Sequence, residues 1–519
     1  MRMGSYADAR SALERNETSC MSLVSSFLAV IERRNDELNV FLHVDAERAL
    51  ARAEELDREI SDGTFRPLTG LVLGVKDVIC VKDSTTTCGS RMLENFVSLF
   101  SATAVERLVD AGAIVIGKLN CDEFAMGSSN ENSYFGPVRN PAHLDYVPGG
   151  SSGGSVSAVA AGMCHVALGT DTGGSIRQPA ALTGVVGLKP TYGRVSRFGL
   201  VAYASSFDVI GPIGTTVQDC AAVLGVMAGR DPRDSTSAPV DVPDFGIQPE
   251  NDLTGIVIGL PSDYFGDGLD DGIRAMLEET VDSLKERGAE FKDIQLPHTK
   301  YGIATYYILV TAEASSNLAR YDGVRFGHSV DAVELRSHLE EEADVLESNL
   351  EQATVSGDAE AISTARKALD RLDTPLQRLY SQTRGEGFGP EVRRRIMLGT
   401  YVLSTGYYDA YYERGQRVRR LISNDFTAAF EEVDAILTPA TPTPAFKIGE
   451  KMGDPLEMYL SDVYTVTANL AGIPGLVVPI GKHADPPHLP VGVQLLGKPF
   501  DEKLLFRIGA EVMSAASVE

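Results

Sequence analysis

Two glycine-rich stretches dominate this 519-residue sequence: GGSSGGS at residues 149–155 and GTDTGGSIR at residues 169–177. Glycine lets the backbone adopt positive φ angles, so such loops can point several N–H groups into one concavity that holds a phosphate or an oxyanion. Neither stretch is followed by the Lys-Ser/Thr pair of a P-loop, and the GxGxxG spacing with a downstream acid is absent. The two loops therefore favour catalysis over phosphate binding.

The second stretch places a serine hydroxyl behind a run of backbone N–H groups. Ser175 follows Thr172, Gly173 and Gly174, whose amides can stabilise an oxyanion beside an attacking hydroxyl. A serine nucleophile also needs a base, but no histidine lies in either loop, and the nearest one, His165, falls in an apolar run. We therefore expect the base to come from another part of the chain.

Lys76 is the candidate base. It lies in the apolar sequence LVLGVKDVI at residues 71–79. Burial among such side chains penalises the charged ammonium and lowers its pKa, and a neutral amine can accept a proton. The alternative is an ion pair with the adjacent Asp77, which would give Lys76 a structural role. The two serine loops favour the catalytic interpretation.

Short apolar runs separated by glycine and polar clusters predict buried strands that alternate with helices. Strands are expected at residues 71–75, 113–116 and 184–188, and helices at residues 102–111 and 156–161. We therefore predict an α/β fold with a central mixed β-sheet covered by helices on both sides.

The predicted domain organisation has two further parts. Residues 1–66 carry the apolar spacing of helices, and residues 67–519 are expected to form the main domain. Within the main domain, two apolar helical stripes in residues 331–384 flank a Ser-Gly-Asp break at residues 356–358. We interpret residues 331–384 as an inserted helical hairpin.

Composition narrows the possible locations and partners. No apolar run approaches the roughly 18 residues that span a bilayer, and residues 1–8 lack the apolar core of a secretion signal. We expect a cytoplasmic protein without membrane contact. The six cysteines include no CxxC pair, so no metal site is expected. The net charge of −25 opposes direct nucleic-acid binding, because phosphate contacts need clustered Lys and Arg.

The sequence around Lys76, the GGSSGGS loop and the GTDTGGSIR loop together resemble the amidase signature family, and residues 67–519 would be its amidase domain. The resemblance implies a Ser-Ser-Lys triad. In that triad Ser175 attacks the amide carbonyl, Ser151 follows a cis peptide bond and relays the proton, and Lys76 is the base. It also implies that Thr172, Gly173 and Gly174 belong to the oxyanion hole.

Segments of the C-terminal half resemble one branch of that family, the A subunits of aspartyl/glutamyl-tRNA amidotransferases. They include GEGFGPEVRRRIMLGT at residues 385–400 and MYLSD at residues 458–462. The resemblance implies that Arg395 pairs with the α-carboxylate of glutamine and Asp462 with its α-ammonium, since a free amino acid needs one fixed cation and one fixed anion. The alternative for Arg395 is a basic helix turn on a solvated face.

The branch implies a glutaminase that supplies ammonia for converting Glu-tRNA(Gln) to Gln-tRNA(Gln). B and C subunits would be its partners; the complex would use ATP and Mg, with no cofactor bound by this chain and tRNA held mainly by a partner. A stand-alone amidase acting on a small carboxamide and a non-catalytic assembly scaffold are the alternatives. Residues 331–384 look longer than the branch requires. The sequence leaves open the role of residues 331–384, the route that the ammonia takes, and whether Asp-tRNA(Asn) is also a substrate.

Overall fold

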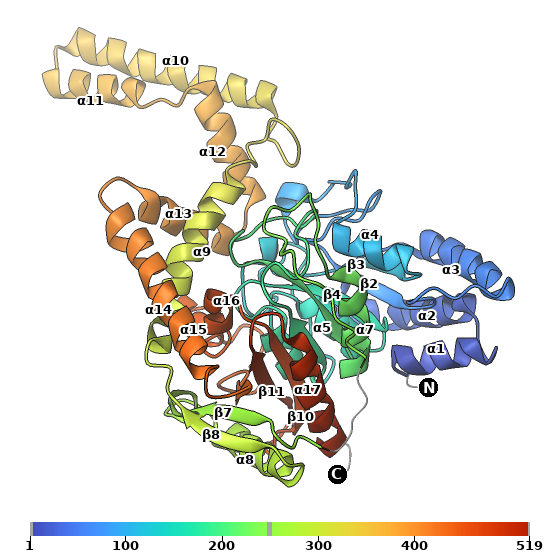
Figure 1. Cartoon of the computed structure of the whole chain (residues 1–519). Coiled ribbons are helices and arrows are strands. Elements are labelled where there is room, and N and C mark those ends of the chain that lie inside the picture. Colours follow the sequence, from blue (N-terminus) through green and yellow to red (C-terminus); the bar gives the residue numbers. More distant parts are fainter. Residues whose placement is uncertain (1–3, 247–251, 517–519) are drawn as a thin grey trace.

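The computed structural model describes residues 4–246 and 252–516, which fold around one large mixed sheet (Figure 1). Within these ranges the sheet has eleven strands in the order β1-β3-β2-β4-β6-β5-β10-β11-β9-β7-β8. Strand β2 pairs in parallel with β3 and β4, β7 pairs in parallel with β8 and β9, and the other neighbours are antiparallel. The strands are β1 (Phe41–Val44), β2 (Val72–Lys76), β3 (Ile114–Leu119), β4 (Val166–Asp171), β5 (Val186–Lys189), β6 (Val209–Gly214), β7 (Val257–Pro261), β8 (Glu290–Ile294), β9 (Ala435–Pro439), β10 (Gly475–Lys482) and β11 (Pro490–Gly497).

Helices pack on the sheet and extend beyond it. In chain order they are α1 (Tyr6–Glu14), α2 (Cys20–Leu38), α3 (Ala46–Ser61), α4 (Thr103–Asp110), α5 (Gly153–Ala160), α6 (Arg177–Thr183), α7 (Val217–Met227), α8 (Asp271–Glu286), α9 (Gly302–Leu318), α10 (Ala332–Ser356), α11 (Ala359–Asp370), α12 (Pro375–Gly387), α13 (Pro390–Leu403), the π-helical turn η5 (Tyr408–Glu413), α14 (Arg414–Ala429), α15 (Pro455–Leu460), α16 (Val466–Ala471) and α17 (Glu502–Ala516).

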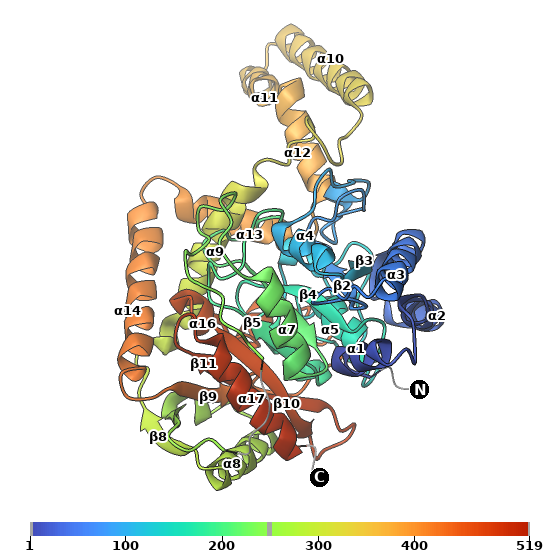
Figure 2. The ribbon, with the colours of Figure 1, turned by 45° about the vertical axis from the view of Figure 1, so that its right-hand side comes forward.

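Each face of the sheet has its own hydrophobic core, because successive side chains of a strand point to opposite faces. Leu73 of β2 belongs to one buried cluster, together with residues of α7 and α17. Val72, its neighbour in the same strand, belongs to a second cluster with residues of α5 and α6. Helices therefore lie on both faces (Figure 2), and the prediction of a central mixed β-sheet covered by helices on both sides is confirmed.

The first 66 residues contain helices α1, α2 and α3, as their apolar spacing predicts, but they also contain a strand. Strand β1 pairs antiparallel with β3 and forms one edge of the sheet. The sequence pattern missed β1, because four residues are too few to show a clear two-residue alternation. The N-terminal segment is therefore joined to the sheet, whereas the domain boundary at residue 66 stays a prediction.

Residues 331–384 contain α10 and α11, which run side by side away from the sheet (Figure 1), and most of a third helix, α12, which the pattern of two apolar stripes did not predict. That this segment is an insertion stays a prediction. Helix α10 ends at Gly357, whose φ of 71° places it in the left-handed region that glycine favours. The Asp358 side chain then accepts hydrogen bonds from two backbone amides of α11 and begins that helix. Helix α12 follows and connects the hairpin to α13.

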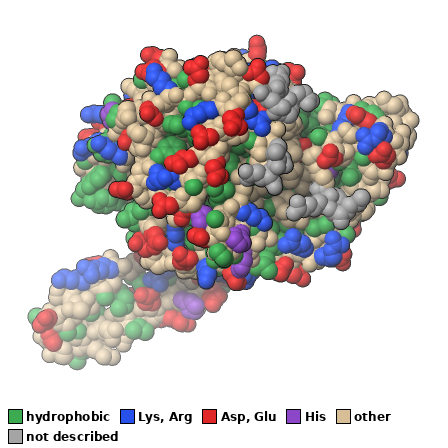
Figure 3. Space-filling model, turned by 90° about the horizontal axis from the view of Figure 1, so that it is seen from below, with side chains coloured by type: hydrophobic (Ala, Val, Ile, Leu, Met, Phe, Trp, Pro, Cys, Tyr) green, Lys and Arg blue, Asp and Glu red, His purple; other side chains and the backbone are tan. Residues whose placement is uncertain are grey.

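Acidic, basic and hydrophobic side chains are intermixed over the face seen from below (Figure 3). Among residues 4–246 and 252–516, no helix combines the length and the apolarity needed to cross a membrane.

Candidate active site

Strand pairing brings the predicted base, Lys76, into contact with one of the two predicted serines, Ser151. Strands β2 and β4 are parallel neighbours, so Lys76 at the end of β2 lies beside the end of β4. The Lys76 Nζ donates to Ser151 Oγ at 2.8 Å, Ser152 Oγ at 2.9 Å and Thr170 Oγ1 at 2.8 Å. The Gly150–Ser151 peptide bond is cis, as the family resemblance implies. The sequence pointed to Ser151, but it gave no sign of the contacts that Ser152 and Thr170 make with the lysine.

Lys76 is completely buried, and burial lowers its pKa to about 8. The structure excludes the alternative in which Lys76 pairs with Asp77. The Asp77 carboxylate instead accepts from Lys118 Nζ at 3.0 Å and from the backbone amide of Thr87 at 2.8 Å. Among the described residues Lys76 therefore has hydroxyl partners only, and a substantial fraction of it is neutral near pH 8, where it can accept a proton.

The loop that carries Ser175 is supported by a buried ion pair. The Arg177 guanidinium lies 3.0 Å from the Asp171 carboxylate, and both side chains are fully buried. The same carboxylate accepts from the backbone amide of Ile176 at 3.2 Å. Asp171 and Arg177 thus support the loop structurally. The Ser175 hydroxyl makes no hydrogen bond to any described residue, so it is available to a substrate.

Three backbone amides of this loop are available as oxyanion donors, and they differ by one from the predicted set. Within the described chain, the amides of Thr172, Gly173 and Ser175 have no acceptor. The Gly174 amide donates to Asp171 Oδ1 at 3.0 Å, so its assignment to the oxyanion hole is not supported by the observed geometry. The Asp171 carboxylate sits inside the turn and accepts this amide, which no linear motif reveals.

Arg395 is buried, with 2% of its surface exposed, whereas Arg393 and Arg394 beside it are exposed. The alternative of a solvated basic turn therefore fails for Arg395. Helix α13 turns this one arginine inward because α13 packs closely on α9. At the contact, a Cβ on Gly399 would lie 1.9 Å from the Thr311 carbonyl oxygen, so only glycine fits there.

Four side chains hold the Arg395 guanidinium, and none of them was predicted from the sequence. Its Nε donates to Glu391 Oε1 at 2.7 Å, and one terminal nitrogen donates to Tyr203 Oη at 2.6 Å. The rings of Tyr307 and Tyr459 lie with their centroids 5.3 Å and 5.5 Å from it. The remaining N–H groups of Arg395 have no hydrogen-bond partner in the part of the chain that the structure describes, so they can bind an anion, and the aromatic rings favour a fixed, desolvated cation.

Asp462 supplies the opposite charge, with 6% of its surface exposed. One carboxylate oxygen accepts from Ser128 Oγ at 2.5 Å, and the other is buried without a hydrogen-bond partner among the described residues. Burial raises the pKa of Asp462 to about 7. The segment that carries Asp462 is hydrogen-bonded to the loop of Ser175, because the hydroxyl of Thr465, three residues after Asp462, donates to the Gly173 carbonyl at 2.7 Å.

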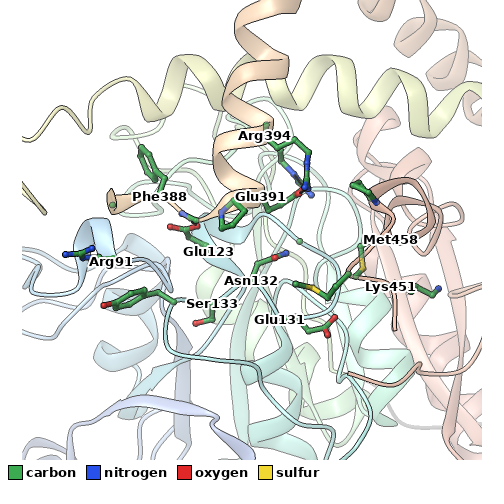
Figure 4. A pocket seen from close by; sticks show the side chains of 18 of the residues that line it. Arg91, Glu123, Glu131, Asn132, Ser133, Phe388, Glu391, Arg394, Lys451 and Met458 are labelled. Atoms are coloured by element: carbon green, nitrogen blue, oxygen red, sulfur yellow. Dashed lines mark hydrogen bonds and ion pairs between the residues drawn. The ribbon is translucent and has the colours of Figure 1, made fainter. Parts of the chain in front are cut away.

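A pocket of about 380 Å³ opens beside Glu391 and Arg394 of α13 (Figure 4). Its walls come from the segment around Glu123 and Asn132, from the start of α13, and from residues 451–459. Lys76, Ser151 and Ser175 do not line this pocket, whereas Arg395 does. The pocket therefore leads from the surface to the Arg395 side of the site.

A family model described as Amidase matches residues 22–506 of the chain. The chain is 60% identical over 513 residues to a Salinibacter ruber protein named as the A subunit of glutamyl-tRNA(Gln) amidotransferase, covering 99% of this chain and all of that protein. It is 51% identical to the protein of the same name from Acidobacterium capsulatum, covering 97% of both chains.

Solved structures show the same similarity. The chain matches the crystal structure of the glutamyl-tRNA(Gln) amidotransferase A subunit from Thermotoga maritima with a TM-score of 0.75 and 38% identity, covering 98% of this chain and 94% of that one. It also matches the native peptide amidase of Stenotrophomonas maltophilia with a TM-score of 0.76 and 30% identity, covering 99% of this chain and 97% of that one.

Proposed function

This chain belongs to the amidase family, and we propose that it is the glutaminase subunit of a tRNA-dependent amidotransferase. The relatives named as A subunits support this choice, since they match the chain along almost its whole length. The observation that carries the substrate assignment is the buried pair of opposite charges, the free N–H groups of Arg395 and the unpartnered oxygen of Asp462. Such a pair suits the two charged ends of free glutamine.

We propose that glutamine is hydrolysed through an acyl-enzyme. Ser175 Oγ attacks the carbonyl carbon of the side-chain amide, while its proton passes to Ser151 and the Ser151 proton passes to Lys76. The amides of Thr172, Gly173 and Ser175 would hold the oxyanion. The relay then runs in reverse: Ser151 gives one proton to the leaving nitrogen, which departs as ammonia, and Lys76 returns a proton to Ser151. Water, activated through the same groups, releases glutamate and restores Ser175.

The remaining steps belong to the partners in this proposal. The B and C subunits would hold the tRNA, activate its glutamyl group with ATP and Mg, and add the ammonia from this chain. The net charge of −25 supports this division, because it opposes contact with a phosphate backbone. We place this work in the cytoplasm, with no cofactor bound by the chain itself.

Replacing Arg395 by alanine should raise the KM for glutamine on the order of 100-fold, because it removes the buried partner of the substrate carboxylate. Hydrolysis of a simple amide without a carboxylate should change little. Steady-state ammonia release with both substrates makes the comparison. Arg393→Ala is the matched control, since that arginine is exposed on the same helix turn. Equal losses on both substrates would rule out the proposed contact.

The isolated chain should bind tRNA weakly or not at all, and its glutaminase activity should rise when the partner subunits, ATP and Glu-tRNA are present. Coupling of this kind delivers ammonia only when an acceptor is ready. Filter binding and ammonia-release assays, each with and without the partners, measure both effects. Tight tRNA binding by the chain alone, or glutaminase activity indifferent to every partner, would instead favour the stand-alone amidase.

A further inference from the structure

An exposed aromatic and apolar patch lies on the outer side of α13, on η5 and on Tyr407, the residue before η5. We call it the tyrosine surface, and it consists of Met397, Leu398, Tyr401, Tyr407 and Tyr411. Their exposed fractions are 72%, 44%, 49%, 39% and 40%. The patch is continuous, because the Tyr401 and Tyr407 ring centroids are 4.3 Å apart and those of Tyr407 and Tyr411 are 6.0 Å apart.

The side chains around the tyrosine surface are mainly basic, whereas the chain as a whole is acidic. In a chain of net charge −25, residues 391–420 carry five exposed arginines, Arg393, Arg394, Arg414, Arg417 and Arg420, and two exposed acidic residues, Asp409 and Glu413. Arg417 pairs with Glu413 and Arg394 pairs with the buried Glu391, whereas Arg393, Arg414 and Arg420 have no carboxylate partner among the described residues. Tyrosine, methionine and arginine are enriched in the cores of protein interfaces, where lysine and acidic residues are depleted. The patch also includes a π-helical turn, a rare element that recurs at functional sites.

The charges of the chain favour one of the macromolecules that could bind to the tyrosine surface. A second copy of this chain is disfavoured, because two molecules of net charge −25 repel one another. Nucleic acid could stack on the tyrosines and contact the arginines, but the acidic body of the protein repels its backbone. A protein with an apolar surface and a rim of carboxylates complements both the rings and the arginines.

We propose that the tyrosine surface is where the ammonia-receiving partner subunit docks, through an apolar face rimmed by carboxylates. This inference rests on the proposed function. It also explains how a partner would influence glutamine binding, because α13 presents Met397 and Tyr401 outward and Arg395 inward. Docking on the outer side restrains the helix that positions the substrate cation.

A second contact connects the same helix to the oxyanion loop. Helix α13 packs on α9 without a gap at Gly399. Tyr306 of α9 in turn closes on Gly173, where an added Cβ would lie 2.5 Å from the tyrosine hydroxyl. Restraining the α9–α13 pair therefore acts on Arg395 and on Gly173 together. We expect the bound partner to lower the KM for glutamine and to raise the rate of hydrolysis.

The test compares the full-length chain with the double variant Met397→Glu/Tyr401→Glu in complexes with the partner subunits. The variant should bind the partners about 30-fold more weakly or worse, which is the effect of losing an interface hot spot. Its glutaminase activity without partners should equal that of the wild type, and the stimulation by partners should be lost. The matched control is Val333→Glu/Val355→Glu on α10, where the two valines are 80% and 90% exposed; it should bind the partners like the wild type.

A second variant, Tyr407→Glu/Tyr411→Glu, changes η5 and the residue before it instead of α13, and it should show the same loss. It replaces the first variant as the test if the first variant folds poorly by circular dichroism. If the wild type binds partners and both folded variants bind them equally well, the docking site is wrong while the proposed function stands. If the wild type binds no partner, the proposed function falls and the docking site with it. Protection of the tyrosines by tRNA alone, or wild-type dimers that the variants abolish, would also overturn the proposal.

Discussion

Replacement of Ser175 by alanine should abolish hydrolysis of glutamine by this chain, with a rate loss on the order of 10⁴-fold or more. The Ser175 hydroxyl is the proposed nucleophile and belongs to the same loop as the free backbone amides of Thr172 and Gly173. Removing the hydroxyl leaves these oxyanion donors with no attacking group. Ammonia release from glutamine measures the effect. Free ammonia supplied to the whole complex should still support amidation, because the variant loses only the ammonia source.

Ser155→Ala is the matched control for Ser175→Ala. The Ser155 hydroxyl is buried and donates to the Leu168 carbonyl at 3.0 Å, and it is not among the hydroxyl groups that Lys76 contacts. Its loss should cost about 1 kcal/mol of stability and leave the glutaminase rate close to that of the wild type. Ammonia release near the wild-type rate from Ser175→Ala, with the fold intact by circular dichroism, would contradict the assignment of the nucleophile.

Replacement of Lys76 by alanine should be nearly as damaging, since groups that act as one catalytic unit give non-additive losses. The double variant with Ser175→Ala should therefore be no worse than either single one. Lys76→Arg should also be inactive, because a guanidinium stays charged and cannot accept a proton. Lys76→Arg keeps a positively charged side chain of similar length. It therefore distinguishes a lysine that accepts a proton from one whose charge is only structural.

The pH dependence gives an independent measurement of the same assignment. Burial lowers the pKa of Lys76 to about 8, while nearby acidic groups including Asp122 and Asp171 oppose the shift. Because the neutral amine is the base, the glutaminase rate should rise as pH rises through about 8 and then level off. A rate that falls over that interval, in a protein that remains folded, would exclude a lysine base.

Local chemistry along the chain was sufficient to single out Lys76 and Ser175 as candidates and to predict several core strands, whereas the role of Ser151 was implied by the family resemblance. Lys76 stands in an apolar run, and Ser175 ends a glycine-rich turn that exposes backbone amides; both features depend on a few adjacent residues. The core strands could be predicted for the same reason, since buried apolar runs bounded by glycine need no knowledge of their neighbours. Strand β1 was missed because its four residues are too few to show a clear two-residue alternation.

The surroundings of Arg395 depended on packing that no local pattern contains. Three consecutive arginines have the same side chain, and only the contact of α13 with α9 determines that Arg395 is buried. Its partners Tyr203, Tyr307 and Tyr459 come from separate parts of the chain. Likewise, the Gly174 amide has an acceptor within the loop because the Asp171 side chain folds back on it. Hydrogen bonds and burial of this kind arise from three-dimensional proximity, so they become visible only once the chain is folded.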